Sequence, residues 1–168
     1  TSLLSPHWGG VPLVMAFAWL VLFGYVRQMA CPPLAAAAWL TSIDLVVDPL
    51  AANRLGCWVW ESTGPYYGVP WSNFGGWFAV SLLLFALAKP RVTPDPRIRW
   101  IGFSAILFFT VAAIGTRLWL AGAIGVGLIL LDLARTARST LPVFHETFSH
   151  AFRRAAPENA GLARYHGC

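Results

Sequence analysis

Five apolar runs divide the chain, and short segments rich in polar, proline or glycine residues separate them. No run has the strict alternation of a barrel strand, and each is close to the short limit for a membrane-spanning helix. The pattern predicts an all-α, polytopic bundle of about five transmembrane helices. The predicted spans are residues 11–26, 34–52, 73–88, 98–114 and 118–133.

The composition agrees with this pattern. Of the 168 residues, 57% are hydrophobic and only 11% are charged, whereas a soluble domain carries about 25% charged residues. We therefore expect an integral membrane protein surrounded by membrane lipid. Three cysteines without a CxxC pair predict neither a disulfide framework nor a zinc site.

The basic residues predict the orientation of the chain. Segments 27–33, 89–99 and 134–168 hold one, four and five of them, whereas the opposite side holds only Arg54 and Arg117. Because Lys and Arg are retained in the cytoplasm, the N-terminus and the loop 53–72 are predicted outside and the C-terminal tail inside. An outside start without a signal peptide leads us to expect a further span upstream. The bases form no single stripe, which argues against nucleic acid as a partner.

We expect two segments: a transmembrane helical domain over residues 1–133 and a basic cytoplasmic tail over residues 134–168. The tail mixes arginines with large apolar residues. It is expected either to lie as an amphipathic helix on an anionic leaflet or to be disordered.

Two acidic residues, Asp44 and Asp48, interrupt the second run. A carboxyl group near the centre of a membrane helix costs about 2.5–3.5 kcal/mol, so such residues usually face the bundle interior. Four residues apart, they project from one helix face with Cβ atoms ~6 Å apart. Two carboxyls that close in a dry site cannot both ionise cheaply, so at least one is expected to be a neutral proton donor near pH 7.

Other interpretations of the two aspartates stay open. Asp48 is also suited to capping the following loop, and Asp44 to pairing with an arginine such as Arg117. Pro49 is expected to end or kink the helix and to leave carbonyl groups free to bind water or a hydroxyl group.

The loop after the second run is rich in aromatic and turn-forming residues. It is predicted either to form an interfacial aromatic belt or to fold back as a lid that lines an apolar slot with rings able to stabilise a cation. Glu61 is its only acid and is expected either to join the aspartates or to be solvated. The candidate binding residues are Trp58, Trp60, Tyr66, Tyr67, Asn73, Phe74 and Trp77.

This central stretch resembles a family of integral-membrane carotenoid biosynthesis proteins, which includes bisanhydrobacterioruberin hydratase and bacterial gamma-carotene 1'-hydratases. The resemblance is dense over about 35 residues and weaker over the helices that follow. The residues that carry it are Asp44, Asp48-Pro49, Gly56, Trp58, Trp60-Glu61, Tyr66-Tyr67-Gly68-Val69-Pro70, Asn73-Phe74 and Gly76-Trp77.

The resemblance implies a carotenoid partner and addition of water to the terminal double bond of a linear carotenoid, without a cofactor. Protonating such an alkene needs a partly desolvated acid, and the resulting tertiary cation needs one positioned water. Our hypothesis makes Asp44 or Asp48 the general acid, and Glu61 or the other aspartate the group that orients water. Asn73 is expected to bind that water or to cap the third helix.

The resemblance also implies a bacterial cytoplasmic membrane, inner or intracytoplasmic, as the location. Family members are longer, with further helices before the matched part. The alternative hypothesis is therefore a non-catalytic subunit that binds a carotenoid or braces other membrane subunits of a larger, photosynthetic complex. No metal ligand set is predicted.

Overall fold

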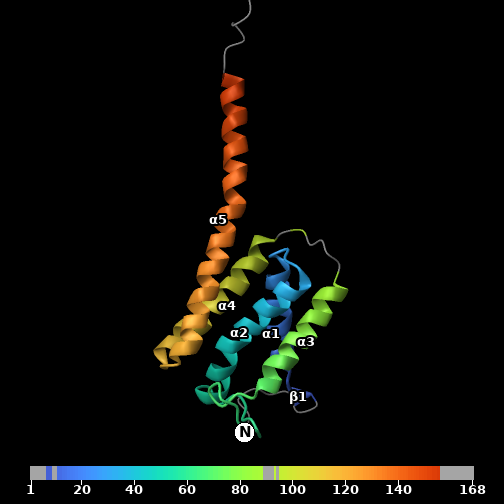
Figure 1. Cartoon of the computed structure of the whole chain (residues 1–168), viewed down its shortest axis with the longest axis vertical. Coiled ribbons are helices and arrows are strands. Elements are labelled where there is room, and N and C mark those ends of the chain that lie inside the picture. The colour runs from blue at the N-terminus through green and yellow to red at the C-terminus, as the bar shows by residue number, and fades with distance from the viewer. Residues whose placement is uncertain (1–6, 9–10, 89–92, 94, 156–168) are drawn as a thin grey trace, which may run out of the picture. The chain divides into compact units, whose positions relative to one another are not determined.

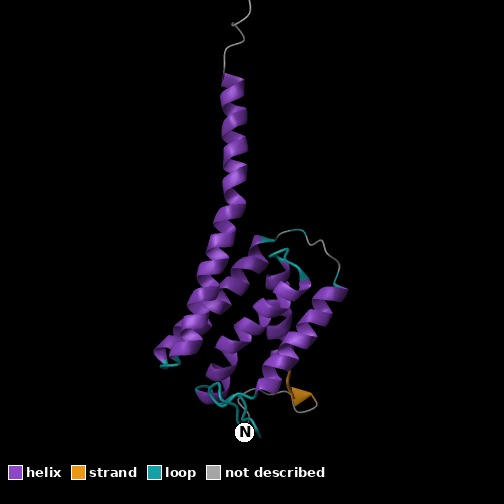
Figure 2. Cartoon of the chain, in the orientation of Figure 1, coloured by secondary structure: helices purple, strands orange, loops and turns teal. Residues whose placement is uncertain are grey.

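The computed structural model describes residues 7–8, 11–88, 93 and 95–155. Within these residues the chain forms five helices: α1 (Leu13–Arg27), α2 (Pro33–Asn53), α3 (Trp71–Leu87), α4 (Pro96–Gly115) and α5 (Trp119–Ala155) (Figures 1 and 2). The predicted all-α architecture is confirmed. The sequence did not predict the two short antiparallel strands before α1, β1 (His7–Trp8) and β2 (Val11–Pro12).

Length and composition make this a helical membrane protein. Three segments are long and apolar enough to cross a bilayer: Pro33–Asn53, Pro96–Gly115 and Trp119–Arg138. Two shorter apolar segments, Phe17–Arg27 and Trp71–Leu87, accompany them. Many large apolar side chains on these helices are exposed, as a lipid-facing surface requires.

Helix α2 is the central element of the bundle. It packs against α1, α3 and α4, which run alongside it (Figure 1). Within its apolar window 61% of the residues are buried, compared with 22% for α4. Its two aspartates, Asp44 and Asp48, are buried and therefore face protein rather than lipid.

Aromatic rings join α1 to α3. Trp19 stacks on Trp77 with ring centroids 4.4 Å apart, and Phe23 stacks on Phe85 at 4.5 Å. On another side of α1, the fully buried Tyr25 ring lies against Gly102 of α4, where a Cβ atom would collide with it. Stacked rings and a close backbone approach thus hold α1 between α3 and α4.

The helix ends differ from the predicted ones in ways that local chemistry explains. Helix α4 begins at Pro96 because Asp95 caps it, its carboxylate accepting a 2.8 Å hydrogen bond from the Arg97 N–H. Of the two effects expected of Pro49, ending the helix is not observed, since α2 continues to Asn53, close to the predicted end of this span at residue 52. The helix can continue because the backbone carbonyl group that loses its donor at Pro49 receives a hydrogen bond from another residue, described below.

The chain divides into two compact units, residues 1–130 and 131–168. The first contains α1 to α4 and the beginning of α5, and the second contains the rest of α5. The segment predicted as a basic tail is helical as far as Ala155. Its amphipathic role stays a prediction, and residues 156–168 lie outside the described residues.

Candidate functional site

Two aspartates and one asparagine form a buried polar cluster between α2 and α3. Asp44 and Asp48 lie one turn apart on α2, and each is only 2% exposed. Asn73, in the first turn of α3, donates hydrogen bonds from Nδ2 to Asp44 Oδ2 at 2.9 Å and to Asp48 Oδ2 at 2.8 Å. The single amide group therefore joins both carboxyls, and we name these three residues the acid cluster.

The cluster confirms that the two aspartates share one helix face. Of the two predicted roles of Asn73, capping the third helix is wrong, and binding the water stays a prediction. Helix α3 begins at Trp71 after Pro70, and no side chain caps it, so Asn73 lies inside the first turn. Asp44 forms no ion pair with Arg117 within the described residues, because its carboxyl faces Asn73.

A tyrosine hydroxyl occupies the backbone position that Pro49 leaves without a donor. In an α-helix the N–H of residue 49 would donate to the carbonyl of residue 45, but proline has no N–H. The Tyr66 hydroxyl donates instead to the Leu45 carbonyl at 2.8 Å. A hydroxyl group does bind the free carbonyl, as expected from the sequence, and it comes from the loop of the same chain.

Tyr66 reaches α2 because a tight turn supports it. The Val69 N–H donates to the Tyr66 carbonyl at 2.9 Å, and the two central residues, Tyr67 and Gly68, have φ of 52° and 80°. Positive φ at both central positions is typical of a type I′ turn, in which glycine is favoured. The Gly64 N–H closes a second rung on the Gly68 carbonyl at 3.1 Å.

Two further hydrogen bonds fix this turn to the helices. Asn53, the last residue of α2, donates from Nδ2 to the Tyr67 carbonyl at 2.8 Å. The Leu120 N–H at the beginning of α5 donates to the Tyr67 hydroxyl at 3.0 Å. The loop therefore packs back onto the bundle at the end where the acid cluster lies.

Aromatic rings cover this end of the bundle. Tyr66, Val69 and Phe74 form a buried apolar cluster, against which Trp60 and Ile124 pack. The Tyr66 ring makes edge contacts with Tyr67 and Phe74, at centroid distances of 4.9 and 5.7 Å. Burial raises the pKa of the Tyr66 phenol, and the neighbouring Tyr67 is a second cause.

Two tryptophans of the loop carry buried indole N–H groups, and one of them, Trp58, lies beside the acid cluster. The Trp58 indole lies close enough to Asp48 to act on its carboxyl. Its Nε1 is nonetheless buried and makes no hydrogen bond within the described part of the chain, and the same holds for Trp60 Nε1. A buried N–H without a partner is costly and therefore marks a place where a ligand or water can bind.

Two predicted site residues do not join the cluster. Glu61 is exposed. Within the described residues, we find no group of three or more carboxyl, thiol or imidazole side chains that could hold a metal ion. Trp77 stacks on Trp19 and belongs to the core between α1 and α3. The loop acid is thus solvated, and the aromatic covering consists of Tyr66, Tyr67, Phe74 and Trp60.

Comparison with known proteins identifies the family of the chain. The carotenoid biosynthesis protein family matches residues 1–132, which include the whole acid cluster and the aromatic loop. Bisanhydrobacterioruberin hydratase of Haloarcula japonica is 32% identical over 137 residues, covering 72% of this chain and 46% of that protein. The chain thus spans about half the length of this relative. No solved structure matches it.

The family match covers the membrane helices as well as the polar residues between α2 and α3. It includes the two features that set α2 apart from an ordinary span, its aspartate pair and its internal proline. This membrane protein belongs to the family of carotenoid biosynthesis proteins.

Proposed function

We propose that the protein adds water to the terminal double bond of a linear carotenoid by acid catalysis. The observation that carries the proposal is the pair of buried carboxyls joined by the Asn73 amide. The family match supports a carotenoid as substrate, and the name of the archaeal relative supports hydration as the reaction.

The reaction needs one acid, one water and no electron transfer. One aspartate, as the neutral carboxylic acid, gives its proton to the less substituted alkene carbon, so that a C–H bond forms while the π bond breaks. Water then attacks the tertiary cation and forms a C–O bond. The proton that the water loses passes to a carboxylate and restores the acid, and the product is a tertiary alcohol.

The geometry suits this division of work between two carboxyls. Asn73 engages Oδ2 of both aspartates, which leaves Oδ1 of each for a reactant. In our proposal one carboxyl protonates the alkene, and the other orients the water. Trp58 Nε1, buried beside Asp48, is the donor that we assign to the water oxygen. Trp60 and Tyr67 supply ring faces for the cation.

The test is hydration in cells that make a linear carotenoid. The chain and its Asp44→Asn and Asp48→Asn variants are expressed there, and extracted pigments are examined by mass spectrometry for a product heavier by one water. We expect the product with the native chain and a loss of about 100-fold or more with the variant that lacks the acid. Asp95→Asn is the matched control, because asparagine also caps a helix.

Glu61→Gln decides which group orients the water. Because Glu61 is exposed, we expect the second aspartate to have this role and the Glu61 variant to retain hydration. Full hydration in both aspartate variants would overturn the proposed mechanism. A folded native chain that gives no product and co-purifies with a large pigmented complex would favour a carotenoid-binding subunit instead.

A further inference from the structure

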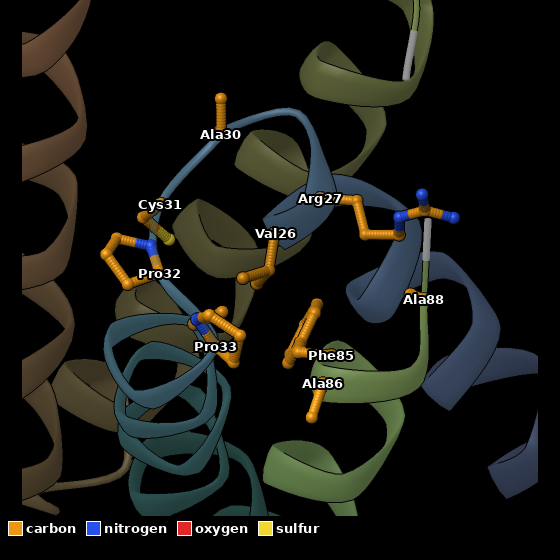
Figure 3. Close-up of a pocket in the computed structure, with 10 residues that line it drawn as sticks. Val26, Arg27, Ala30, Cys31, Pro32, Pro33, Phe85, Ala86 and Ala88 are labelled. Atoms are coloured by element: carbon orange, nitrogen blue, oxygen red, sulfur yellow. The ribbon is translucent and has the colours of Figure 1, made fainter. Parts of the chain in front are cut away.

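A cavity of about 380 Å³ lies toward the ends of α2 and α3 that are opposite the acid cluster. The end of α1, the beginning of α2 and the end of α3 form it (Figure 3). Val26, Pro33 and Phe85 lie around it, with Ala36 and Ala86 nearby. The protein therefore has a second candidate site, separate from the acid cluster, whose lining side chains are mostly apolar.

The walls of this cavity suit a hydrocarbon group. Alanine, proline, valine and phenylalanine make up most of them, and Arg27 is the one charged residue among the lining residues, all of which are described. Figure 3 shows the Arg27 side chain running along the edge toward Ala88. The apolar side chains of this lining suit a branched hydrocarbon end group, while Arg27 and backbone groups of the lining residues give the cavity a polar edge.

The two sites are spaced alike along both helices that connect them. Twelve residues separate Ala36 from Asp48 on α2, and twelve separate Asn73 from Phe85 on α3. At 1.5 Å per residue, each helix places the cavity about 18 Å from the acid cluster. Helix α2 runs from the cavity to the cluster and α3 runs back, so both sites lie along the same pair of helices.

We propose that this cavity binds the far part of the carotenoid whose near end reacts at the acid cluster. This inference rests on the substrate class of the proposed function. A linear carotenoid is a stiff apolar rod that spans much of the ~30 Å hydrocarbon core. With its reacting end at the acid cluster, its polyene chain is long enough to reach the cavity about 18 Å away. Contact there selects for chain length and holds the reacting end in register.

The experiment compares two substrates that share one end group. A full-length linear carotenoid and a shortened analogue are supplied to the purified chain in lipid nanodiscs, and hydration and retained pigment are both measured. Ala86→Phe fills the cavity, and Ala86 itself is exposed, so the variant is expected to fold. Leu83→Phe, on the same helix and outside the lining, is the matched control.

We expect Ala86→Phe to raise KM for the long substrate about tenfold, with little change in kcat and no change for the short one. Leu83→Phe should leave both substrates unaffected. An equal change in KM for the long and the short substrate in Ala86→Phe would overturn the inference. So would native mass spectrometry in which the variant loses a phospholipid instead of pigment.

The pigment measurement separates this inference from the proposed reaction. If the native chain hydrates neither substrate, but Ala86→Phe still lowers retention of the long carotenoid alone, the cavity is confirmed and the hydratase proposal fails. If the native chain hydrates the substrate but Ala86→Phe retains as much long carotenoid as the native chain does, the proposed reaction is supported and the cavity does not bind the substrate.

Discussion

The Tyr66 hydroxyl donates its hydrogen bond to the Leu45 carbonyl, one turn before Pro49 on α2. The loop thereby replaces the donor that proline removes from the helix. This bond lies on the same turn of α2 that carries Asp44 and Asp48, and it joins the aromatic covering to the acid cluster. The backbone defect in α2 and the folded loop are therefore two parts of one arrangement.

Replacing Tyr66 with phenylalanine should destabilise the protein through this single bond. Tyr66→Phe leaves the Leu45 carbonyl without a donor, and we expect a cost of about 1–2 kcal/mol. In a Pro49→Ala background the helix supplies its own N–H to Leu45, so the same change should cost about 0.5 kcal/mol or less. Thermal unfolding in detergent measures all four proteins of the cycle.

Tyr67→Phe is the control for this cycle. It removes the hydroxyl group of the neighbouring ring, which accepts a hydrogen bond from the Leu120 N–H of α5. Its cost should be the same in the native chain and in the Pro49→Ala background. If Tyr66→Phe lowers stability by the same amount with Pro49 and with Ala at position 49, the Tyr66 hydroxyl does not compensate for the proline.

Alkaline pH should destabilise the native protein more than the Tyr66→Phe variant. Burial raises the pKa of the Tyr66 phenol above that of the unfolded chain, which is about 10. The folded state then keeps a proton that the unfolded state releases, so this contribution is complete below about pH 10 and declines as pH rises beyond it. The change in Tm between about pH 8 and pH 11 checks this, and an identical change in both proteins would contradict it.

Asn73→Leu should lower stability and abolish hydration together. The change removes the donor from two carboxyls that are each 2% exposed, and we expect a loss of about 1–3 kcal/mol. A triple variant with leucine at positions 44, 48 and 73 should recover much of that stability, because no buried carboxyl group is left without its donor. It should recover no activity. Recovery of hydration in the triple variant would show that the cluster is only structural.

Two native cysteines can test the predicted orientation. Cys31 precedes α2 and Cys57 follows it, and both are free and partly exposed. With Cys168 replaced by serine, a membrane-impermeant maleimide should label Cys57 from outside intact cells and Cys31 only in inverted vesicles, since the arginine distribution places the loop outside. The reverse pattern would show that the orientation is wrong.

Local sequence pattern was sufficient for the helices and for the shared face of Asp44 and Asp48. Apolar runs longer than about 15 residues have few alternatives to helices in a membrane. A separation of four residues places two side chains on one helix face whatever surrounds them. The exact helix ends depend on details that hydropathy does not show. Helix α4 begins where the Asp95 side chain caps it, and α3 begins after Pro70. Helix α2 continues past Pro49 while the Tyr66 hydroxyl, from another segment, binds the Leu45 carbonyl.

The sequence by itself therefore determined a membrane-embedded helical protein with a costly pair of acids on its second helix, because hydropathy and helical periodicity are local properties. Only the tertiary structure decided that Asn73 joins these acids, that Tyr66 completes α2, and that Glu61 and Trp77 lie apart from the cluster. The two decisive contacts join residues 21 to 29 positions apart. Contacts of that kind depend on how α3 and the loop pack against α2, which no local pattern specifies.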